Sequence, residues 1–324
     1  MKVFHDLAAL RRERKNVWLA AGFFDGVHRG HRAVIRRVVA MARRRGDAPW
    51  IMTFDMHPLK LLAPRNAPPL LTSIPHKIRL MEAEGIRGCI VLRFTRATAR
   101  MLPEKFMARL AGSFRNLSGL VIGSNWTFGR HGAGTPQVLK ALGKKHGFRV
   151  SVVRPTRWRG RPISSTRIRR SLARNRLADA AAMLGRDFSL TGKVVSGRRI
   201  GGRLLGVPTA NVDCHNEALP AGGVYAVRTA FGGRVYGGVA NIGRCPTIRA
   251  CLPGRSRART TLEVHLFGTH AGMRGRMVEV FFIKKIRAEK RFGSLAALRA
   301  RMLEDIALAR RIIARGRHRR TWRK

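Results

Sequence analysis

The chain of 324 residues carries 66 Lys and Arg against 17 Asp and Glu, a formal net charge of +49, and 45% of its residues are hydrophobic. This length indicates two domains, each able to bury a core of its own. No apolar run approaches the about 20 residues of a membrane-spanning helix, which argues against an integral membrane protein. The start lacks the apolar segment of a signal peptide, so we expect a cytoplasmic protein.

The positive charge allows two interpretations. Many Lys and Arg residues attract phosphate and favour nucleic-acid binding. Here, however, they are spread over every segment and Arg predominates, a pattern typical of compositional bias. The end of the chain, 316–324, is the densest basic stretch, and we expect it to be a disordered tail. We therefore expect no dedicated nucleic-acid partner and no membrane partner.

The first candidate site follows a predicted buried strand, Val17–Ala21. Residues 22–31 read G-F-F-D-G-V-H-R-G-H, and the next segment, 32–45, has the apolar spacing of a helix. His28 and His31 therefore lie where a strand passes into a helix, beside free backbone amides that suit a bound phosphate. The pattern predicts a nucleoside-triphosphate site.

The spacing of these two histidines has a chemical reason. The rings of His28 and His31, three residues apart on a first helical turn, lean to one side. There they can hold the α- and β-phosphates and stabilise the charge that develops during attack at the α-phosphorus. The alternative is a pair of loop histidines on a glycine-rich turn, with no role in binding.

This stretch, G-x-F-D-G-V-H-x-G-H, resembles the signature of the prokaryotic bifunctional riboflavin kinase/FAD synthetases. The N-terminal half of that family belongs with the HxGH nucleotidylyltransferases. The resemblance implies ATP as co-substrate and His28 and His31 as catalytic residues. It also implies that the same stretch binds the nucleotide through Gly22, Phe24, Asp25 and Gly30.

Up to about residue 185, predicted strands alternate with predicted helices. The strands are expected at 50–54, 89–94, 120–122 and 150–153, and the helices at 77–84, 103–110 and 136–146. This alternation predicts an α/β doubly wound parallel sheet, covered by helices on both faces, with its ligands at the carboxyl ends of the strands.

Residues 53–58, T-F-D-M-H-P, follow the second of these strands and therefore fall at the same edge as His28. They are similar to the family's T-F-x-x-H-P. The resemblance implies that His57 and Pro58 bind the flavin.

Residues 123–129, G-S-N-W-T-F-G, follow another strand and are similar to the family's G-x-[DN]-F-x-F-G. Trp126 replaces the usual phenylalanine and keeps an aromatic surface on which a base or the flavin ring can lie; the resemblance implies flavin binding by Trp126. Asn125 offers a neutral amide for a phosphate or a ribose hydroxyl. Core packing is the alternative for the aromatic residues, and for Phe128 it is at least as well supported as ligand contact.

Residues 163–169, I-S-S-T-R-I-R, match the family's I-S-S-T-x-I-R in full. Three hydroxyls at the opening of a helix provide an N-cap and phosphate donors, and an arginine one turn later can fork onto phosphate oxygens. An ordinary helix cap is the alternative. In this position the segment resembles a second phosphate clamp, formed by Ser164, Ser165, Thr166 and the catalytic Arg169.

From residue 190 the pattern changes to short β-branched runs separated by Gly and Pro, with a two-residue hairpin turn predicted within 231–234. The runs cover 190–195, 223–231, 235–240, 261–266 and 277–283. Five or six antiparallel strands at this spacing predict a small closed β-barrel. A final helix at 294–314 has an apolar face that should dock on the barrel, made of Leu295, Leu298, Met302, Ile306, Ala309 and Ile313.

Residues 202–211, G-R-L-L-G-V-P-T-A-N, resemble the riboflavin kinase signature G-R-x-L-G-[FW]-P-T-A-N. Glycines let backbone amides approach ATP phosphates, while Thr209 and Asn211 supply hard oxygen ligands for Mg²⁺. Taken alone, P-T-A-N would be a turn more often than a site. The nucleotide-binding residues that the resemblance implies are Gly202, Arg203, Gly206 and Pro208.

The kinase half also needs a base. Glu263 alternates with apolar neighbours on a predicted strand, and by resemblance it accepts the proton of the ribityl hydroxyl as that oxygen attacks the γ-phosphorus. A salt-bridged carboxylate of the barrel is the alternative. Similarity to the family's N-I-G-x-x-P-T and I-R-x-E-x-x-F implies flavin binding by Asn241, Thr247 and Arg287.

The similarity covers about residues 15 to 313. It departs from the family at Val207, where an aromatic residue is usual, and at 272–275, which lack an acid and a tyrosine; both departures concern ligand binding in the kinase half. We predict an FMN adenylyltransferase domain at 1–186 and a riboflavin kinase barrel at 187–315.

The predicted activity is phosphorylation of riboflavin to FMN, followed by adenylylation of FMN to FAD with release of pyrophosphate. ATP and Mg²⁺ are required, and riboflavin, FMN and FAD are the flavin ligands. The alternatives are a protein with one live activity, another HxGH transferase acting on a different phosphorylated alcohol, or a nucleic-acid-binding protein on the same scaffold.

Overall fold

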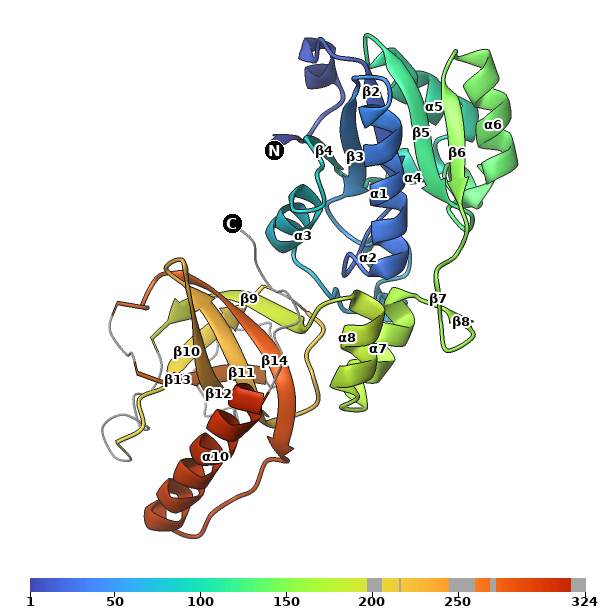
Figure 1. Ribbon diagram of the computed structural model, residues 1–324. Helices are drawn as coiled ribbons and strands as arrows, with labels where there is room; N and C mark the ends of the chain where they lie inside the picture. The colour runs from blue at the N-terminus through green and yellow to red at the C-terminus, as the bar shows by residue number, and fades with distance from the viewer. Residues whose placement is uncertain (197–205, 216, 245–259, 269–271, 316–324) are drawn as a thin grey trace. The chain divides into compact units, whose positions relative to one another are not determined.

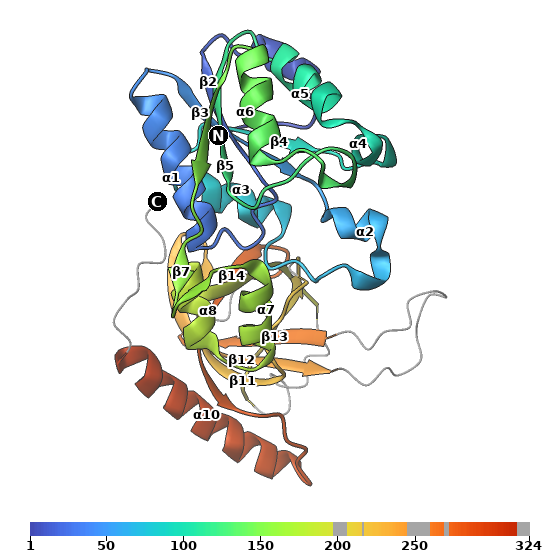
Figure 2. The same cartoon turned by 90° about the vertical axis from the view of Figure 1, so that its right-hand side faces the viewer.

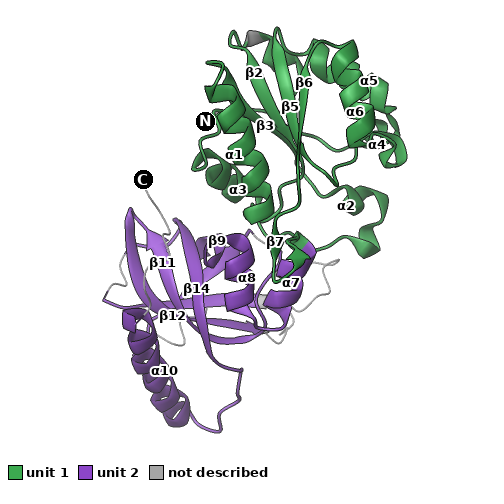
Figure 3. Ribbon diagram, turned by 45° about the vertical axis from the view of Figure 1, so that its right-hand side comes forward, with its two compact units in different colours: residues 1–165 green, residues 166–324 purple. Residues whose placement is uncertain are grey.

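The computed structural model describes residues 1–196, 206–215, 217–244, 260–268 and 272–315. The chain forms two compact units, Met1–Ser165 (unit 1) and Thr166–Lys324 (unit 2) (Figure 3). Three residues expected to bind substrates, Gly202, Arg203 and Thr247, lie outside the described residues, as does the basic tail.

Unit 1 contains a parallel sheet of six strands in the order β1-β4-β3-β2-β5-β6 (Figure 1). The strands are β1 Lys2–Phe4, β2 Val17–Ala21, β3 Ala48–Phe54, β4 Gly88–Leu92, β5 Leu117–Gly123 and β6 Arg149–Val153. The predicted parallel sheet is confirmed. Only β1 was not expected, because its three mostly exposed residues carry no apolar pattern.

Helices cover both faces of this sheet. They are α1 Arg29–Arg43, α2 Pro58–Leu62, α3 Ile74–Glu82, α4 Arg96–Arg100, α5 Pro103–Gly112 and α6 Pro136–Lys145, with 3-10 turns at Ala8–Arg12, Pro64–Asn66 and Arg130–Gly132. α1 lies on one face, and α5 and α6 lie on the other (Figure 2). α1 and α3 begin three residues earlier than expected, because His28 and Ser73 act as their N-caps.

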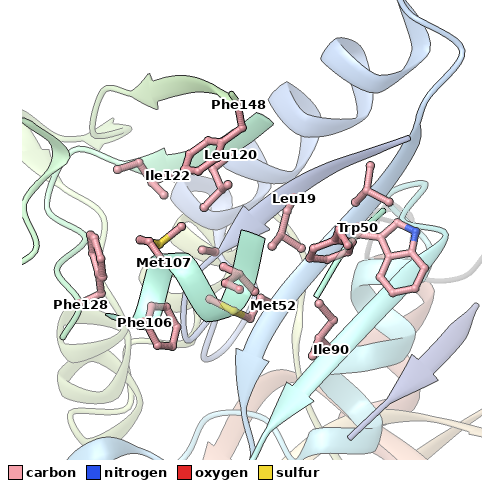
Figure 4. Close-up of a cluster of buried hydrophobic side chains, with 14 of the residues drawn as sticks. Leu19, Trp50, Met52, Ile90, Phe106, Met107, Leu120, Ile122, Phe128 and Phe148 are labelled. Atoms are coloured by element: carbon pink, nitrogen blue, oxygen red, sulfur yellow. The ribbon is translucent and has the colours of Figure 1, made fainter. Parts of the chain in front are cut away.

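Side chains along the central strand β2 point alternately to the two faces of the sheet, so the core of unit 1 consists of two clusters, one on each face. Leu19 belongs to the cluster on the α5 and α6 face, and its neighbour Trp18 to the cluster on the α1 face. Figure 4 shows the first of these clusters, with Phe106 and Met107 of α5 beneath the strands. Both faces are apolar, so the strands read as nearly continuous hydrophobic runs.

Each of the two large indoles in this core lies over a glycine of the next strand. Trp18 is paired in register with Gly119, and Trp50 with Gly88. A Cβ atom at Gly119 would lie 2.6 Å from the Trp18 ring, and one at Gly88 would lie 2.2 Å from the Trp50 ring. Only glycine leaves room for these rings at the two positions.

Unit 2 is a closed antiparallel barrel, as expected from the sequence, and its strands follow the order β10-β13-β12-β11-β14-β9. Its strands are β9 Phe188–Val195, β10 Ala210–Cys214, β11 Gly223–Phe231, β12 Arg234–Arg244, β13 Thr260–Leu266 and β14 Met277–Arg287. The predicted hairpin turn is confirmed, because Phe231 pairs with Arg234 and both intervening glycines have positive φ (56° and 76°). β10 was not recognised as a strand.

In the described part of unit 2, two helices precede the barrel in the chain, and one helix follows it. A short hairpin of unit 1, β7 Arg157–Trp158 and β8 Arg161–Pro162, leads to α7 Ser165–Ala173 and α8 Leu177–Leu184, and α10 Leu295–Arg315 follows β14. α8 packs on β9 and β14, and α10 packs on β11, β12 and β14. The apolar face of α10 docks as expected at Ala309, but Leu295 is 53% exposed, so that part of the expectation was wrong.

Candidate functional sites

The turn between β2 and α1 has an unusual backbone. Phe24, Gly26 and Val27 all have positive φ, at 53°, 81° and 40°. Only glycine adopts this region without cost, and strained turns of this kind cluster at functional sites. The side chains of Phe24 and Val27 are buried in the core of the α1 face, and this burial offsets the strain.

His28 and His31 lie against each other at the start of α1. Nδ1 of His28 accepts a hydrogen bond from the backbone N–H of His31 (3.2 Å), so His28 is the N-cap of the helix. Because Nδ1 is an acceptor, the neutral ring carries its proton on Nε2. The two rings are stacked with centroids 3.6 Å apart, and the Phe24 ring packs edge-on against His31.

Gly30 lies between the His28 ring and the segment that holds the serine residues. A Cβ atom at Gly30 would lie 3.1 Å from the His28 ring and 3.9 Å from the Ile163 carbonyl oxygen. Ser165 donates a hydrogen bond from Oγ to the backbone carbonyl of Asp25 (2.9 Å). The I-S-S-T segment therefore contacts the histidine turn at Ser165. Thr166 and Arg169 belong to unit 2, and their role as a phosphate clamp stays a prediction.

Asp25 is turned into the protein. Its carboxylate accepts hydrogen bonds from the backbone N–H groups of Leu71 (3.0 Å) and Thr72 (3.2 Å) and from the Thr72 hydroxyl, and it is 2% exposed. The N–H of Gly26 donates to the same Thr72 hydroxyl. Asp25 therefore fastens the turn to the segment before α3, which is a different task from the expected contact with the nucleotide.

Asn125 and the His28 turn follow neighbouring strands, β5 and β2, at the point where the strand order reverses. Ligands of doubly wound sheets bind in the crevice at this point. Asn125 is exposed, and Trp126 is half-buried with its ring stacked on Phe128 at 4.8 Å. Phe128 itself belongs to the core, which favours the core-packing interpretation for that residue.

His57 and Pro58 approach the same turn through Phe23. His57 is the N-cap of α2, since its Nδ1 accepts a hydrogen bond from the Leu59 N–H (3.1 Å), and Pro58 is the first residue of that helix. The His57 ring packs edge-on against the Phe23 ring with centroids 5.0 Å apart. Flavin binding by this pair stays a prediction.

Lys77 is a residue of this site that the sequence did not single out. Its side chain is 1% exposed, and Nζ donates to the Phe23 carbonyl (2.7 Å) and to Oγ1 of Thr53 (3.3 Å). Burial lowers the pKa of Lys77 from its ordinary value of 10.5 to about 8. A signal was present, because Lys77 falls on the apolar face of α3 between Ile74 and Met81.

The second site is a cavity of about 340 Å³ in unit 2, between the barrel and α10. Asn211, Glu263 and Asn241 lie directly opposite one another on the adjacent strands β10, β13 and β12, so their side chains share one face of the wall. The described residues of the predicted kinase site that line the cavity are Thr209, Asn241, Glu263 and Arg287.

Glu263 has the environment of a base. It is half-buried, and within the described ranges no cation forms an ion pair with it. Desolvation raises the pKa of its carboxyl group above the ordinary value of 4.5. The arrangement does not support the alternative of a salt-bridged barrel carboxylate.

Arg287 is held by α10. Its guanidinium forms an ion pair with Asp305, whose side chain is 3% exposed. Nε and Nη2 both lie 2.9 Å from Oδ2, and Nε lies 3.2 Å from Oδ1. Both residues line the cavity, next to Phe292, over which the guanidinium lies. Arg287 therefore joins the end of β14 to α10, and the flavin contact expected for it stays a prediction.

His265 is the second residue that the sequence did not single out. It lines the cavity, and its Nδ1 lies 2.9 Å from the carbonyl oxygen of Pro208. Because a carbonyl oxygen only accepts, Nδ1 of His265 carries the proton. His265 thus holds the residue before Thr209 against β13. Gly206 has a positive φ of 67° and is exposed, and Val207 is buried and fills part of the cavity wall.

Neither site offers a preformed metal cage. Within the described part of the chain, no three His, Cys, Asp or Glu side chains are placed to hold a metal ion. None of the described helices combines the length and apolar character needed to span a bilayer.

Two families match the chain, one on each side of α7 and α8. The family described as FAD synthetase matches residues 10–167, and the family described as riboflavin kinase matches residues 184–313. The compact units divide after Ser165, whereas the sequence places the domain boundary after residue 186.

Curated relatives match over nearly the full length. The bifunctional riboflavin kinase/FMN adenylyltransferase of Escherichia coli is 36% identical over 293 residues, 90% of this chain and 91% of that protein. Those of Haemophilus influenzae and Pseudomonas fluorescens are 33% and 32% identical, covering 96% and 98% of this chain and 98% and 100% of the relatives. The crystal structure of a macrolide-efflux protein from Streptococcus pneumoniae is similar with a TM-score of 0.83 and 25% identity, over 96% of this chain and 99% of that one.

Proposed function

The chain belongs to the bifunctional riboflavin kinase/FMN adenylyltransferase family, and from this premise we propose which of its residues carry out each activity. The enzyme transfers phosphate from ATP to riboflavin, which gives FMN, and transfers the adenylyl group of ATP to FMN, which gives FAD. The stacked histidines of unit 1 are the observation that carries the assignment of the second reaction, and the Asn211–Glu263–Asn241 row carries that of the first.

Adenylyl transfer is assigned to the turn between β2 and α1. A phosphate oxygen of FMN attacks the α-phosphorus of ATP, a new P–O bond forms, and the bond to pyrophosphate breaks. His28 donates from Nε2 to the phosphate oxygens, and His31 contributes a second imidazole to the charge that builds up on them. Asn125 and Ser164 position the phosphates, and Ser165 holds the turn through the Asp25 carbonyl.

Riboflavin phosphorylation is assigned to the barrel cavity. Glu263 accepts the proton of the ribityl hydroxyl as its oxygen attacks the γ-phosphorus of ATP, and ADP leaves. The raised pKa of its carboxyl group brings it closer to the proton affinity that a general base needs near neutral pH. Asn241, which pairs with Glu263 on the neighbouring strand, orients the flavin beside it.

Mg²⁺ is the metal ion that the kinase activity calls for, and the residues present fit it. Thr209 and Asn211 are two residues apart in an extended segment and supply a hydroxyl and an amide oxygen. Mg²⁺ prefers oxygen ligands and usually keeps several waters and substrate phosphates, so two protein ligands are enough. When bound there, the ion neutralises charge on the transferred phosphoryl group.

The experiment that tests these activities separates the flavins after incubation with ATP and Mg²⁺. Riboflavin as substrate is expected to yield FMN and then FAD, and FMN alone is expected to yield FAD and pyrophosphate. FMN without FAD, or FAD formation from FMN without phosphorylation of riboflavin, would leave one of the two sites without its assigned reaction.

A further inference from the structure

We propose that Lys77 is a positioning residue for adenylyl transfer, whose buried ammonium group holds the Phe23 carbonyl and thereby the strained turn that carries His28 and His31. The inference rests on the proposed assignment of adenylyl transfer to this turn. Lys77 touches neither histidine in the contacts described above, and it acts through the backbone that presents them.

Two donors converge on the Phe23 carbonyl. Nζ of Lys77 lies 2.7 Å from the oxygen, and Oγ1 of Thr53 donates to the same oxygen at 2.9 Å. Nζ also donates to Oγ1 of Thr53, and it lies 4.1 Å from the centroid of the Phe23 ring. The carbonyl and the ring of one residue are therefore both held by one cation, next to the positive φ of Phe24.

The turn is held at a second point by the same stretch of chain. Asp25 is fastened to the N–H groups of Leu71 and Thr72, six and five residues before Lys77. Residues 71–77 thus grip the turn on both sides of Phe24. A strained backbone persists only where its surroundings over-determine it, and these two attachments do so here.

An apolar side chain would fill this space at a lower desolvation cost than lysine, so space-filling alone does not explain a lysine here. Its neighbours on the apolar face of α3 are Ile74, Ile78 and Met81, and burying an ammonium among them is unfavourable unless it is well paired. Among the described residues, the titratable groups that act electrostatically on Lys77 are Asp25 of the turn and Cys89 of β4, and burial keeps the Cys89 thiol uncharged at neutral pH. His57 is the other titratable group nearby, and its ring packs on the Phe23 ring, the same ring that the Lys77 ammonium contacts.

The arrangement has a consequence for pH. Burial lowers the pKa of Lys77 to about 8, so above this pH the ammonium loses its charge and its grip on the Phe23 carbonyl and ring weakens. Adenylyl transfer is then expected to fall, while the kinase activity of unit 2 has no reason to follow. FMN and ATP phosphates are already ionised above pH 7.5, since their last pKa lies near about 6.

Loss of the fold does not account for such a decline. Lysine in the unfolded chain keeps its ordinary pKa of 10.5, so between pH 8 and 9 the unfolded chain binds more protons than the folded one. The Lys77 contribution to stability therefore grows as the pH rises through this window. Burial raises the pKa of Cys89 from its ordinary value of 9.0 to about 12, and this opposes the trend. Its effect is smaller below pH 9, where most of the unfolded thiol is still protonated.

The test uses the full chain and measures both activities between pH 7 and 9. In the natural protein, kcat/KM for FAD formation is expected to decline with a midpoint near pH 8, because this ratio reports groups of the free enzyme. Lys77→Met is expected to lower kcat for FAD formation about tenfold or more and to remove the decline, with riboflavin phosphorylation within twofold of the natural rate. Lys140→Met, which changes an exposed lysine of α6, is expected to alter neither activity.

Retention of FAD formation within twofold in Lys77→Met, or a decline near pH 8 that persists in this variant, would overturn the proposal. If thermal unfolding shows that unit 1 of the variant does not fold, the pH profile of the natural protein is the test. A kcat/KM for FAD formation that stays constant from pH 7.5 to 9 overturns the proposal. A decline in this ratio with unchanged thermal unfolding supports it. His28→Ala separates this outcome from failure of the proposed function, because FAD formation that survives in His28→Ala removes the assignment of the turn itself.

Discussion

Glu263 of β13 lies directly opposite Asn211 of β10 in the wall of the barrel. The pairing places the proposed base beside the proposed metal ligand without any loop between them, so both are held by strand backbone. We expect Glu263→Gln to lose riboflavin phosphorylation by about 100-fold or more, because an amide cannot accept the proton. FAD formation from added FMN, which uses the other unit, is expected to stay unchanged; a parallel loss of both activities would contradict two separate sites.

The same residue should set the acid limit of the kinase. Burial raises the pKa of Glu263, and a base must be unprotonated, so activity is expected to fall as the pH drops through a value above 4.5. The measurement is kcat/KM for riboflavin phosphorylation between pH 4.5 and 8. A profile that is flat across this range would show that Glu263 is not the group whose protonation limits the reaction.

His28 has two tasks that substitution can separate. His28→Ala removes both the cap of α1 and the Nε2 donor, whereas His28→Asn keeps an oxygen that can accept from the His31 N–H. We expect both variants to lose FAD formation and to keep riboflavin phosphorylation. Thermal unfolding should show unit 1 of His28→Ala less stable by about 1 kcal/mol and His28→Asn close to the natural protein. His5→Ala, at an exposed position, serves as the control.

His265 should act on the kinase through Pro208. His265→Ala removes the Nδ1 donor, and kcat/KM for riboflavin phosphorylation is expected to fall about tenfold because Thr209 is less well placed. His265→Asn puts an amide N–H near the position of Nδ1 and is expected to recover most of this loss. Equal activities of the two variants would mean that the hydrogen bond to Pro208 does not matter.

The ion pair between Arg287 and Asp305 should hold α10 on the barrel. Asp305→Ala leaves the Arg287 guanidinium largely buried without its carboxylate, which is expected to cost about 3–5 kcal/mol of the stability of unit 2. Thermal unfolding of unit 2 measures this loss. The double variant Arg287→Met/Asp305→Leu removes both charges and is expected to regain much of it; if it is no more stable than Asp305→Ala, the pair is not the cause.

The local pattern of apolar residues and glycines was sufficient to predict most strands and helices of the fold. The strands of unit 1 are buried on both faces and read as apolar runs, and Gly232 and Gly233 identify the hairpin between β11 and β12. β10 was missed although Ala210–Cys214 alternate apolar and polar residues, because the strand is only five residues long and its first two residues belong to the P-T-A-N motif, which was interpreted as a binding site. β1 is too short to leave any pattern.

The partners of site residues could not be predicted, because they are distant in sequence. The motif residue Asp25 faces Leu71 and Thr72, and the Lys77 ammonium reaches back to Phe23. No periodicity links positions about fifty residues apart. The sequence therefore identified the two turns and strands around which each candidate site is built, but it missed Lys77 and His265 and did not distinguish residues that face a substrate from those that hold the backbone in place.

The pairing of Trp18 with Gly119 determines how β2 and β5 end. If β5 slipped by one residue, a side chain would meet the indole where only a hydrogen atom fits, so the two strands have a single permitted alignment. The fixed alignment also fixes the ends of the two strands relative to each other. The loop after β2 carries His28 and His31, and the loop after β5 carries Asn125. The packing of one indole ring in the core thus fixes the relative position of the two loops that carry these residues.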